Sequence, residues 1–229
     1  MSKFELKGSS MPALIVHLDQ GESIVAESNA MVAMSTTLDL NAKTDGVLGM
    51  AMRKLTKNES MFQQGIEAKR GPGSVMLSSE LPGDIKVVEV GSLQMCLNDG
   101  AFVACDASVS MHSRMQKLSA AFFGKTGGFL VMETSGQGNI AISALGEIIE
   151  SPVPYDGLIV DNSHVVAWEN SLQYSVSVST KKGGLLGNIA NSQMTGEGVV
   201  LKFTGQGRVW LSTRSFQSLF DYIKKESSK

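Results

Sequence analysis

The sequence predicts an all-β protein, a β-sandwich built from three internal repeats and followed by a C-terminal helix. Two repeated motifs and one helical apolar stripe support this prediction. The first motif is Gly-x-Gly, then a polar residue, then a stretch whose outer residues are apolar. It occurs at Gly71-Pro72-Gly73, Gly136-Gln137-Gly138 and Gly205-Gln206-Gly207. Because its first glycines are 65 and 69 residues apart, the chain reads as three related units.

A second motif, with a central alanine, repeats independently of the first. It occurs as Ala30-Met31-Val32-Ala33-Met34, Ala101-Phe102-Val103-Ala104-Cys105 and His164-Val165-Val166-Ala167-Trp168, at offsets of 71 and 63 residues. Each copy precedes a Gly-x-Gly by a similar distance, so the order within a unit is also repeated. We therefore expect one domain of three units, at roughly 12–79, 85–145 and 152–214.

The residues around these motifs predict strands and turns. Glycine permits positive φ at a turn or bulge, and the alternating apolar residues that follow indicate strands with one buried face. The segments 14–18 and 23–26 alternate around Asp19-Gln20-Gly21, which predicts a hairpin that opens the first unit. The core positions predicted by alternation after each Gly-x-Gly are Val75, Leu77, Ile140, Ile142, Val209 and Leu211.

A helix is predicted over 215–226. Ser215 is a suitable N-cap, and Lys224 and Lys225 suit the helix C-terminus. Four apolar residues fall at i, i+3, i+4 and i+7 and make one face: Phe216, Leu219, Phe220 and Ile223. We expect this helix to form a lid over an open end of the sheets.

Composition and charge exclude several classes of protein. The 229 residues are 42% hydrophobic, and 20 basic and 22 acidic residues give a formal net charge of −2. This balance gives no global field to gather nucleic acid or anionic lipid. No apolar run has the length of a signal peptide or of a spanning helix, which predicts a cytoplasmic protein. Cys96 and Cys105 are expected to be buried free thiols, although they could also face each other across a hairpin.

Three connecting loops are apolar where an exposed loop should be polar. Apolar surface of this kind marks contacts, so we expect packing against a neighbouring repeat or subunit, or binding to a protein or membrane surface. A homo-oligomer would bury these loops between its copies. The candidate contact residues are Leu48, Met50, Phe122, Phe123, Leu185 and Leu186.

No motif predicts a cofactor or metal site. Gly124-Lys125-Thr126 resembles the end of a phosphate-binding loop but lacks its first glycine, because residue 119 is serine. The Gly-x-Gly motifs lack the third glycine of a dinucleotide fingerprint and lead into strands. The three histidines, at 17, 112 and 164, have no partner at ligand spacing.

No catalytic residue is assigned from the sequence either. Glu59 and Glu197 occupy comparable positions, which allows a pair of catalytic carboxylates but favours a turn or cap role. A hydrolase with His164 or His112 as its base remains a weaker alternative, since triads are assembled in space.

The ordered motifs also resemble one family. Gly183-Gly184-Leu185-Leu186, then the segments 195–201 and 204–214, are similar to the C-terminal signature of the altered-inheritance-of-mitochondria twenty-four family, and 47–60, 71–73 and 81–85 match its earlier part. The resemblance implies a sandwich like that of trp RNA-binding attenuation proteins, often assembled as a trimer, with no agreed activity and no catalytic residues.

These observations lead to a functional expectation with alternatives. The sequence favours a non-enzymatic scaffold or binding protein that acts as a homo-oligomer, most simply a trimer. An RNA-binding module is the alternative, and it rests on fold analogy alone. The cluster of Lys202, Arg208 and Arg214 near Trp210 is the basic group that such a module would use, although the net charge disfavours nucleic acid as a partner.

Overall fold

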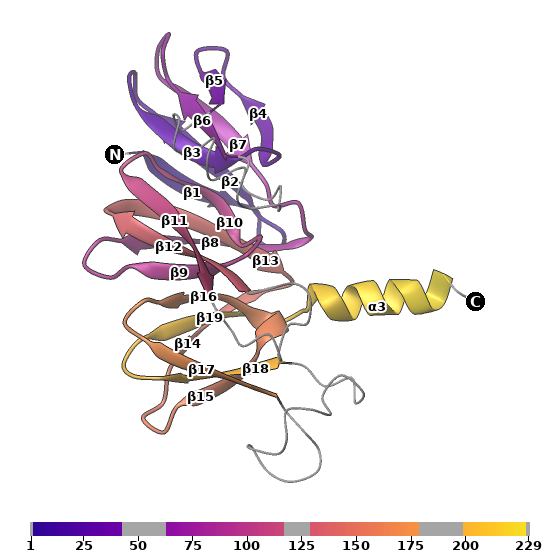
Figure 1. Cartoon of the computed structure of the whole chain (residues 1–229). Coiled ribbons are helices and arrows are strands. Elements are labelled where there is room, and N and C mark those ends of the chain that lie inside the picture. Colours follow the sequence, from indigo (N-terminus) through magenta and orange to yellow (C-terminus); the bar gives the residue numbers. More distant parts are fainter. Residues whose placement is uncertain (1, 43–62, 117–128, 179–198, 228–229) are drawn as a thin grey trace. The chain divides into compact units, whose positions relative to one another are not determined.

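The chain folds into antiparallel β-sheets and a C-terminal helix, which confirms the predicted all-β class (Figure 1). A computed structural model describes residues 2–42, 63–116, 129–178 and 199–227. The strands of these residues form four sheets, here named A to D. Their strand orders are β1-β2-β7-β4 in sheet A, β5-β6-β3-β10-β13-β8 in sheet B, β11-β12-β9-β16-β19-β14 in sheet C and β15-β18-β17 in sheet D.

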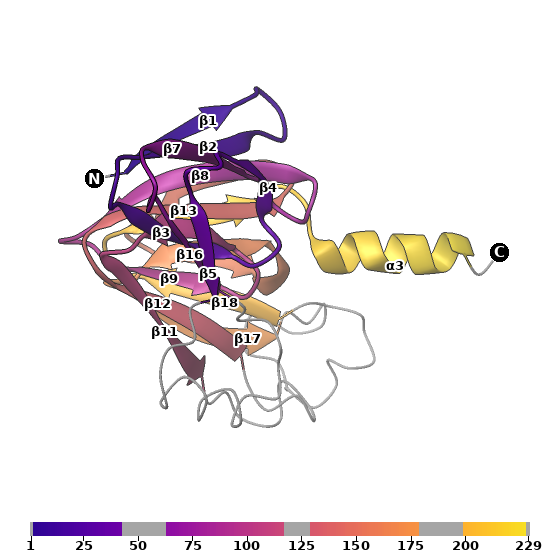
Figure 2. The same ribbon diagram turned by 90° about the horizontal axis from the view of Figure 1, so that it is seen from above.

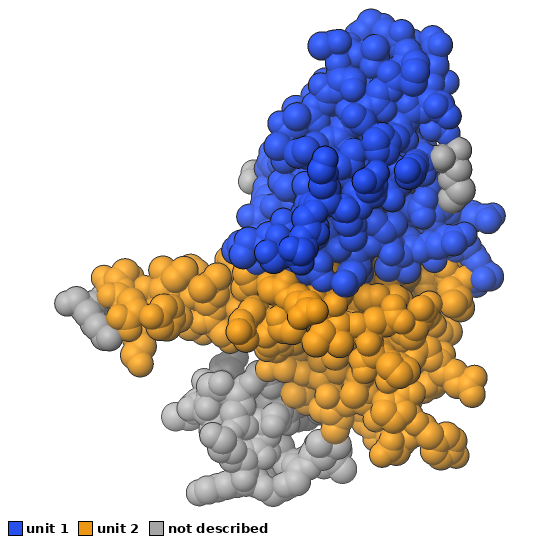
Figure 3. Space-filling model, turned by 180° about the vertical axis from the view of Figure 1, so that it is seen from behind, with its two compact units in different colours: residues 1–92, 99–110, 135–144 blue, residues 93–98, 111–134, 145–229 orange. Residues whose placement is uncertain are grey.

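The chain divides into two compact units, shown in Figure 3. Unit 1 comprises residues 1–92, 99–110 and 135–144, and unit 2 comprises 93–98, 111–134 and 145–229. Sheets A and B lie almost entirely in unit 1, whereas sheets C and D lie almost entirely in unit 2. Each unit therefore has a pair of sheets with its own core.

The described strands recur as three sets of six. These sets correspond to the three units expected from the sequence, and they are named repeats 1, 2 and 3 to distinguish them from the two compact units. An additional strand, β1 (Lys3–Lys7), precedes them and pairs with β2. Repeat 1 contains β2 (Ala13–Leu18), β3 (Ser23–Glu27), β4 (Met31–Met34), β5 (Asp39–Ala42), β6 (Gln63–Glu67) and β7 (Gly73–Leu77). Repeat 2 contains β8 (Gly83–Val90), β9 (Met95–Asn98), β10 (Phe102–Asp106), β11 (Val109–Gln116), β12 (Phe129–Gly136) and β13 (Gly138–Leu145). Repeat 3 contains β14 (Ile148–Pro152), β15 (Leu158–Asp161), β16 (Val165–Glu169), β17 (Gln173–Val178), β18 (Val199–Thr204) and β19 (Arg208–Ser212), with a 3₁₀ turn at Asn162–His164.

Within a repeat, the first, third and sixth strands share one sheet and the second, fourth and fifth share another. The predicted hairpin at the start of repeat 1 is therefore wrong. Strand β2 pairs with β1 and β7 in sheet A, whereas β3 pairs with β6 and β10 in sheet B. The turn at Asp19 instead carries the chain between sheets, because alternate residues of both strands, such as Val16 and Ile24, are buried in the same core.

The alanine motif and the strand after Gly-x-Gly are hydrogen-bonded neighbours in every repeat. Strand β4 pairs with β7, β10 with β13 and β16 with β19. All three ladders shift register at the residue before the central alanine, and that residue is always a valine: Val32, Val103 or Val166. An extra residue on one strand is a β-bulge. The same irregularity at the same point shows that the two sequence motifs are the two sides of one local structure.

Each unit has an apolar core between its two sheets. In unit 1, the buried face of β2 meets side chains of β3 and β6, including Ile24 and Ile66. In unit 2, Trp168 packs edge-on against Tyr174 and tilted against Phe203, with ring centroids 5.4 and 5.7 Å apart. The predicted core positions are confirmed: Val75, Leu77, Ile140, Ile142 and Val209 are fully buried, and Leu211 is half-buried against the unit 2 core.

The predicted C-terminal helix is α3 (Phe216–Ser227). Its cap is also as predicted, since the Ser218 backbone N–H donates to the Ser215 hydroxyl at 3.3 Å. The expected lid is wrong. No residue of α3 is buried, and the helix extends away from the strands of unit 2 (Figures 1 and 2). Its apolar face therefore contributes nothing to the core of its own chain.

Candidate interaction surfaces

The glycines of the Gly-x-Gly motifs meet two structural requirements, a positive φ and a close approach of neighbouring atoms. The first has positive φ in every repeat: +150° at Gly71, +95° at Gly136 and +106° at Gly205. The second has no room for a side chain. A Cβ at Gly138 would lie 2.9 Å from the Asp106 side chain, and one at Gly207 would lie 2.9 Å from Glu169. In repeat 2 both requirements hold at both glycines, since Gly138 has φ of +150° and a Cβ at Gly136 would lie 2.2 Å from the Ser108 carbonyl oxygen.

A polar side chain that sequence reasoning missed ties each Gly-x-Gly to the alanine motif. The side chain two residues after the central alanine accepts a hydrogen bond from the residue after the second glycine. Ser35 accepts from the Ser74 backbone N–H at 3.0 Å, Asp106 accepts from that of Asn139 at 2.7 Å, and Glu169 accepts from Arg208 Nε at 2.5 Å. The fixed spacing from the alanine is the signal that would have found these residues.

A second repeated bond fastens the same turn. The hydroxyl two residues further on donates to the carbonyl oxygen between the two glycines. These donors are Thr37 to Pro72 at 3.0 Å, Ser108 to Gln137 at 2.7 Å and Ser171 to Gln206 at 3.3 Å. Both bonds recur at all three turns, so these polar groups fix the turn against the alanine motif.

His164 and Ser212 are neighbours, but not in the arrangement of a nucleophile and its base. His164 Nδ1 lies 2.8 Å from the backbone carbonyl oxygen of Ser212, and the Ser212 hydroxyl donates to the backbone carbonyl oxygen of His164 at 3.3 Å. A base must contact the hydroxyl proton itself. The pair therefore joins the start of β16 to the end of β19.

The arginine side chains beside the turns form ion pairs with carboxylates or donate hydrogen bonds to carbonyl oxygens. Arg208 bridges Glu169 and Glu150, and its guanidinium carbon lies 5.2 Å from the ring centroid of Trp210. The hydrogen bond that Arg208 donates to Glu169 raises the pKa of Arg208 above its ordinary value. Two carboxylates offset its charge, which weakens the basic cluster that RNA binding would need.

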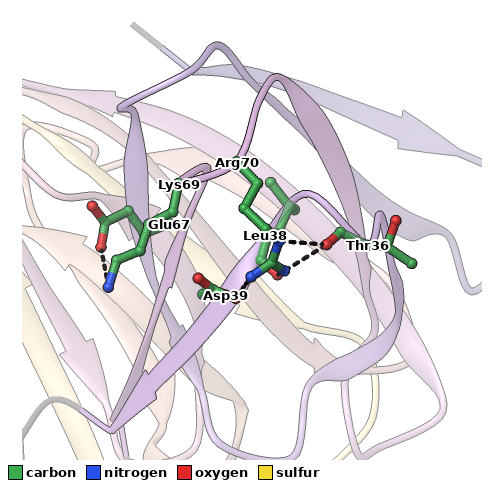
Figure 4. Close-up of polar contacts among 6 residues, drawn as sticks. All are labelled: Thr36, Leu38, Asp39, Glu67, Lys69 and Arg70. Atoms are coloured by element: carbon green, nitrogen blue, oxygen red, sulfur yellow. Dashed lines mark hydrogen bonds and ion pairs between the residues drawn. The ribbon is translucent and has the colours of Figure 1, made fainter.

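Repeat 1 has a different arginine contact, shown in Figure 4. Arg70 donates to the carbonyl oxygens of Thr36 and Leu38 and pairs with Asp39, while the neighbouring Lys69 pairs with Glu67 at 3.5 Å. Arg70 thus holds the connection between β4 and β5 against the turn that precedes Gly71.

Cys96 and Cys105 are both buried thiols that form no disulfide, as predicted. Glu27 is the described carboxyl with a large pKa shift. Burial, then the nearby carboxylates of Glu80 and Asp99, raise its pKa to about 7. These side chains form no metal site, since the described residues contain no group of three His, Cys, Asp or Glu side chains placed to hold a metal ion.

Glu27 should make stability depend on pH. Its pKa is about 7 in the folded chain against 4.5 ordinarily, so the folded state binds the proton more tightly and loses stability as pH rises from about 4.5 to 7. We expect Glu27→Gln to raise the free energy of unfolding by about 2 kcal/mol at pH 8 and to change it little at pH 4.5. Urea titrations at both pH values measure this difference. Glu67→Gln is the control, and an equal gain at both pH values would contradict the assignment.

The six predicted loop contacts lie outside the described residues: Leu48, Met50, Phe122, Phe123, Leu185 and Leu186. The same holds for Glu59, Glu197 and Gly124-Lys125-Thr126. What the structure does show is where these loops attach. Each joins the fourth and fifth strands of its repeat, which are neighbours in one sheet: β5 and β6, β11 and β12, β17 and β18. That the loops lie at or beside a subunit interface stays a prediction.

Large apolar residues are exposed on five edge strands: Leu6 on β1, Val32 on β4, Leu40 on β5, Ile149 on β14 and Ile159 on β15. Val32, at the bulge of β4, is 55% exposed, whereas the equivalent Val103 and Val166 are 0% and 4% exposed. Ile159 in β15 is 47% exposed. Sheet A ends at β4 and sheet D ends at β15, so neither strand has a second neighbour among the described strands. These edges were not predicted, because exposure at the ends of a repeat array depends on which strands pair.

The apolar face of α3 is the other exposed surface. Phe216, Phe220 and Ile223 are each more than half exposed, and the Phe216 and Phe220 rings stack on each other at 6.4 Å. Two acidic and two basic residues balance the charge of this helix, which gives it little attraction to an anionic membrane. No helix in the described part of the chain is long and apolar enough to cross a membrane.

Comparison with known proteins shows the same fold in a protein of Streptococcus pyogenes. An uncharacterised protein of Streptococcus pyogenes serotype M6 is 30% identical over 226 residues, which cover 96% of this chain and 88% of that protein. A crystal structure of a Streptococcus pyogenes protein, 29% identical, covers 99% of this chain and 100% of its own with a TM-score of 0.79. The family model described as Mitochondrial biogenesis AIM24 matches residues 4–214. The chain therefore belongs to the AIM24 family.

Proposed function

We propose that this protein is a non-enzymatic scaffold that acts as a homo-oligomer of three copies. The observation that carries the proposal is the contrast between equivalent residues at the bulges of the repeats. Val103 and Val166 are covered where a strand of the preceding repeat adjoins β10 and β16, whereas Val32 is exposed on β4. A second copy would cover Val32 in the same way. The number of copies comes from the family resemblance.

The geometry around the candidate catalytic groups supports a scaffold rather than a hydrolase. His164 contacts a backbone carbonyl, and the buried carboxylates Asp106 and Glu169 are held by the Gly-x-Gly turns. The basic group that favoured RNA contains Arg208, whose charge is offset by Glu150 and Glu169. These contacts favour assembly over chemistry as the role of the described surface.

The oligomer is tested by sedimentation of the wild-type chain and one edge variant. We expect wild type at micromolar concentration to sediment at three times the 24.4 kDa mass of one chain. Val32→Asp should shift the protein to the mass of one chain, because burying an unpaired charge costs several kcal/mol or more. Its far-ultraviolet circular dichroism should stay β-rich, since Val32 is exposed in the single chain.

Two controls separate the edge from other apolar surfaces. Ile149→Asp places the same charge on β14, where Ile149 is 49% exposed, and should leave the mass unchanged. Phe220→Asp does the same for α3. Dissociation by Phe220→Asp and not by Val32→Asp would move the interface to the helix, and a wild type that sediments as one chain would contradict the proposal.

A further inference from the structure

We infer that β15 of one copy pairs antiparallel with β4 of a second copy, so that sheet D of the first continues into sheet A of the second. This inference rests on the homo-oligomer proposed above and names its interface. It begins from the way in which the repeats of one chain already join. The third strand of a repeat pairs antiparallel with the second strand of the preceding repeat, β10 with β3 and β16 with β9.

One third strand and one second strand of the chain take part in neither junction. Strand β4 is the third strand of repeat 1, and within the chain it has no preceding repeat to pair with. Strand β15 is the second strand of repeat 3, and no described strand of another repeat pairs with it. Sheets B and C, which contain a junction, have six described strands, whereas A and D have four and three. An unpaired edge of this kind is a template for strand addition.

The two edges are complementary rather than identical. At both existing junctions, the third strand of one repeat pairs with the second strand of another repeat. Strand β4 should therefore pair with β15 and not with another β4. The contact is therefore head-to-tail, and a head-to-tail contact generates a closed ring or an open chain. A ring covers every β4 and β15 edge, which leaves none exposed for further growth.

The existing junctions also fix the register. Ala104 faces Ala26, and Ala167 faces Leu97. Each facing residue lies seven positions before the central alanine of its own repeat, since 33 minus 26 and 104 minus 97 both equal 7. The corresponding position in repeat 3 is 160, seven before Ala167. Ala33 of one copy should therefore face Val160 of the next.

The neighbouring position gives a direct comparison of burial. In this register Met34 faces Ile159, just as Cys105 faces Val25 and Trp168 faces Cys96 at the existing junctions. Val25 and Cys96 are 2% and 6% exposed, but Ile159 is 47% exposed. The proposed pairing would cover Ile159 as its two equivalents are covered.

A disulfide across the proposed junction tests it, with the variant Met34→Cys/Ile159→Cys. Cysteine already occupies both equivalent positions in repeat 2, at Cys105 and Cys96, so the fold accommodates it there. Facing residues of an antiparallel pair have Cα atoms about 4.5–5.5 Å apart, which a disulfide can bridge. After mild oxidation with diamide, a non-reducing gel should show covalent multimers up to the number of copies, with most chains linked. Reduction should return one band.

Matched variants show whether the link depends on register. Met34→Cys alone, Ile159→Cys alone and wild type should give no multimers, because Cys96 and Cys105 are buried. In Met34→Cys/Leu158→Cys the second thiol points to the opposite face of β15, and linking should fall at least tenfold. Equal linking by this variant would overturn the register.

Other outcomes separate this inference from the proposed function. If wild type sediments as an oligomer but the double variant does not link, the strand pairing is wrong and the homo-oligomer stands. If the double variant links within a single chain, β4 and β15 meet in the same copy and the pairing between copies is overturned. A wild type that sediments as one chain would overturn both.

Discussion

Trp168→Ala is expected to lower the free energy of unfolding of unit 2 by about 3–5 kcal/mol. Trp168 is 1% exposed and lies at the centre of the unit 2 core, in contact with Tyr174 and Phe203. Its removal leaves a cavity that the strands on either side, fixed by their ladders, cannot close. It also removes two aromatic contacts, each worth roughly 0.5–1.5 kcal/mol beyond burial.

Urea unfolding followed by circular dichroism measures this loss. Trp168→Phe is the matched control, because it keeps an aromatic ring at the same place and should cost less than half as much. The two compact units have separate cores, so the loss should appear in one part of the transition if the units unfold separately. A loss below about 1 kcal/mol for Trp168→Ala would mean that the core repacks around the missing ring, contrary to the close packing expected of interiors.

Gly136→Ala is expected to cost about 2–4 kcal/mol through two effects that a single control can separate. Gly136 has φ of +95°, and a Cβ there would lie 2.2 Å from the backbone carbonyl oxygen of Ser108. The backbone of the turn must move to relieve this overlap, which would stretch the hydrogen bond from the Ser108 hydroxyl to the Gln137 carbonyl.

Gly100→Ala is the control for backbone conformation alone. Gly100 has φ of +76°, and nothing lies within 4 Å of the position of its Cβ. It should therefore cost only the roughly 1–2 kcal/mol of a left-handed alanine. Chemical denaturation of both variants gives the difference. Equal losses of unfolding free energy in the two variants would show that the turn moves away from the carbonyl oxygen at no cost. The close approach would then not explain why residue 136 is glycine.

The sequence predicted the local structures well because each motif depends on few residues. Gly71, Gly136 and Gly205 are followed by alternating apolar residues whose spacing indicates a strand whatever its partners are. The helix at 216–227 was also predictable, since Ser215 and the spacing from Phe216 to Ile223 are local signals. The strand β1 carried such a signal too, because its five residues alternate polar and apolar, but it lies outside the repeated motifs and was missed.

Pairing between strands was not accessible from the same signals. The alternation of apolar and polar residues indicates that β2 and β3 each have a buried face. The same alternation is expected for a hairpin and for two strands in opposite sheets. The polar partners Ser35, Asp106 and Glu169 were missed for a related reason: their acceptor role depends on a turn some 35 residues further along the chain. The six loop residues, from Leu48 to Leu186, stay a prediction from sequence.

The sequence by itself determined that the chain is built of β-strands, that its motifs occur three times and that a capped amphipathic helix ends it, because these properties follow from spacing and local conformation. Only the tertiary structure decided which strands join the repeats, since hydrogen bonding between strands depends on segments far apart in the chain. That pairing covers Val103 and Val166 and exposes Val32 and Ile159, although no local feature of the sequence distinguishes the three bulge valines.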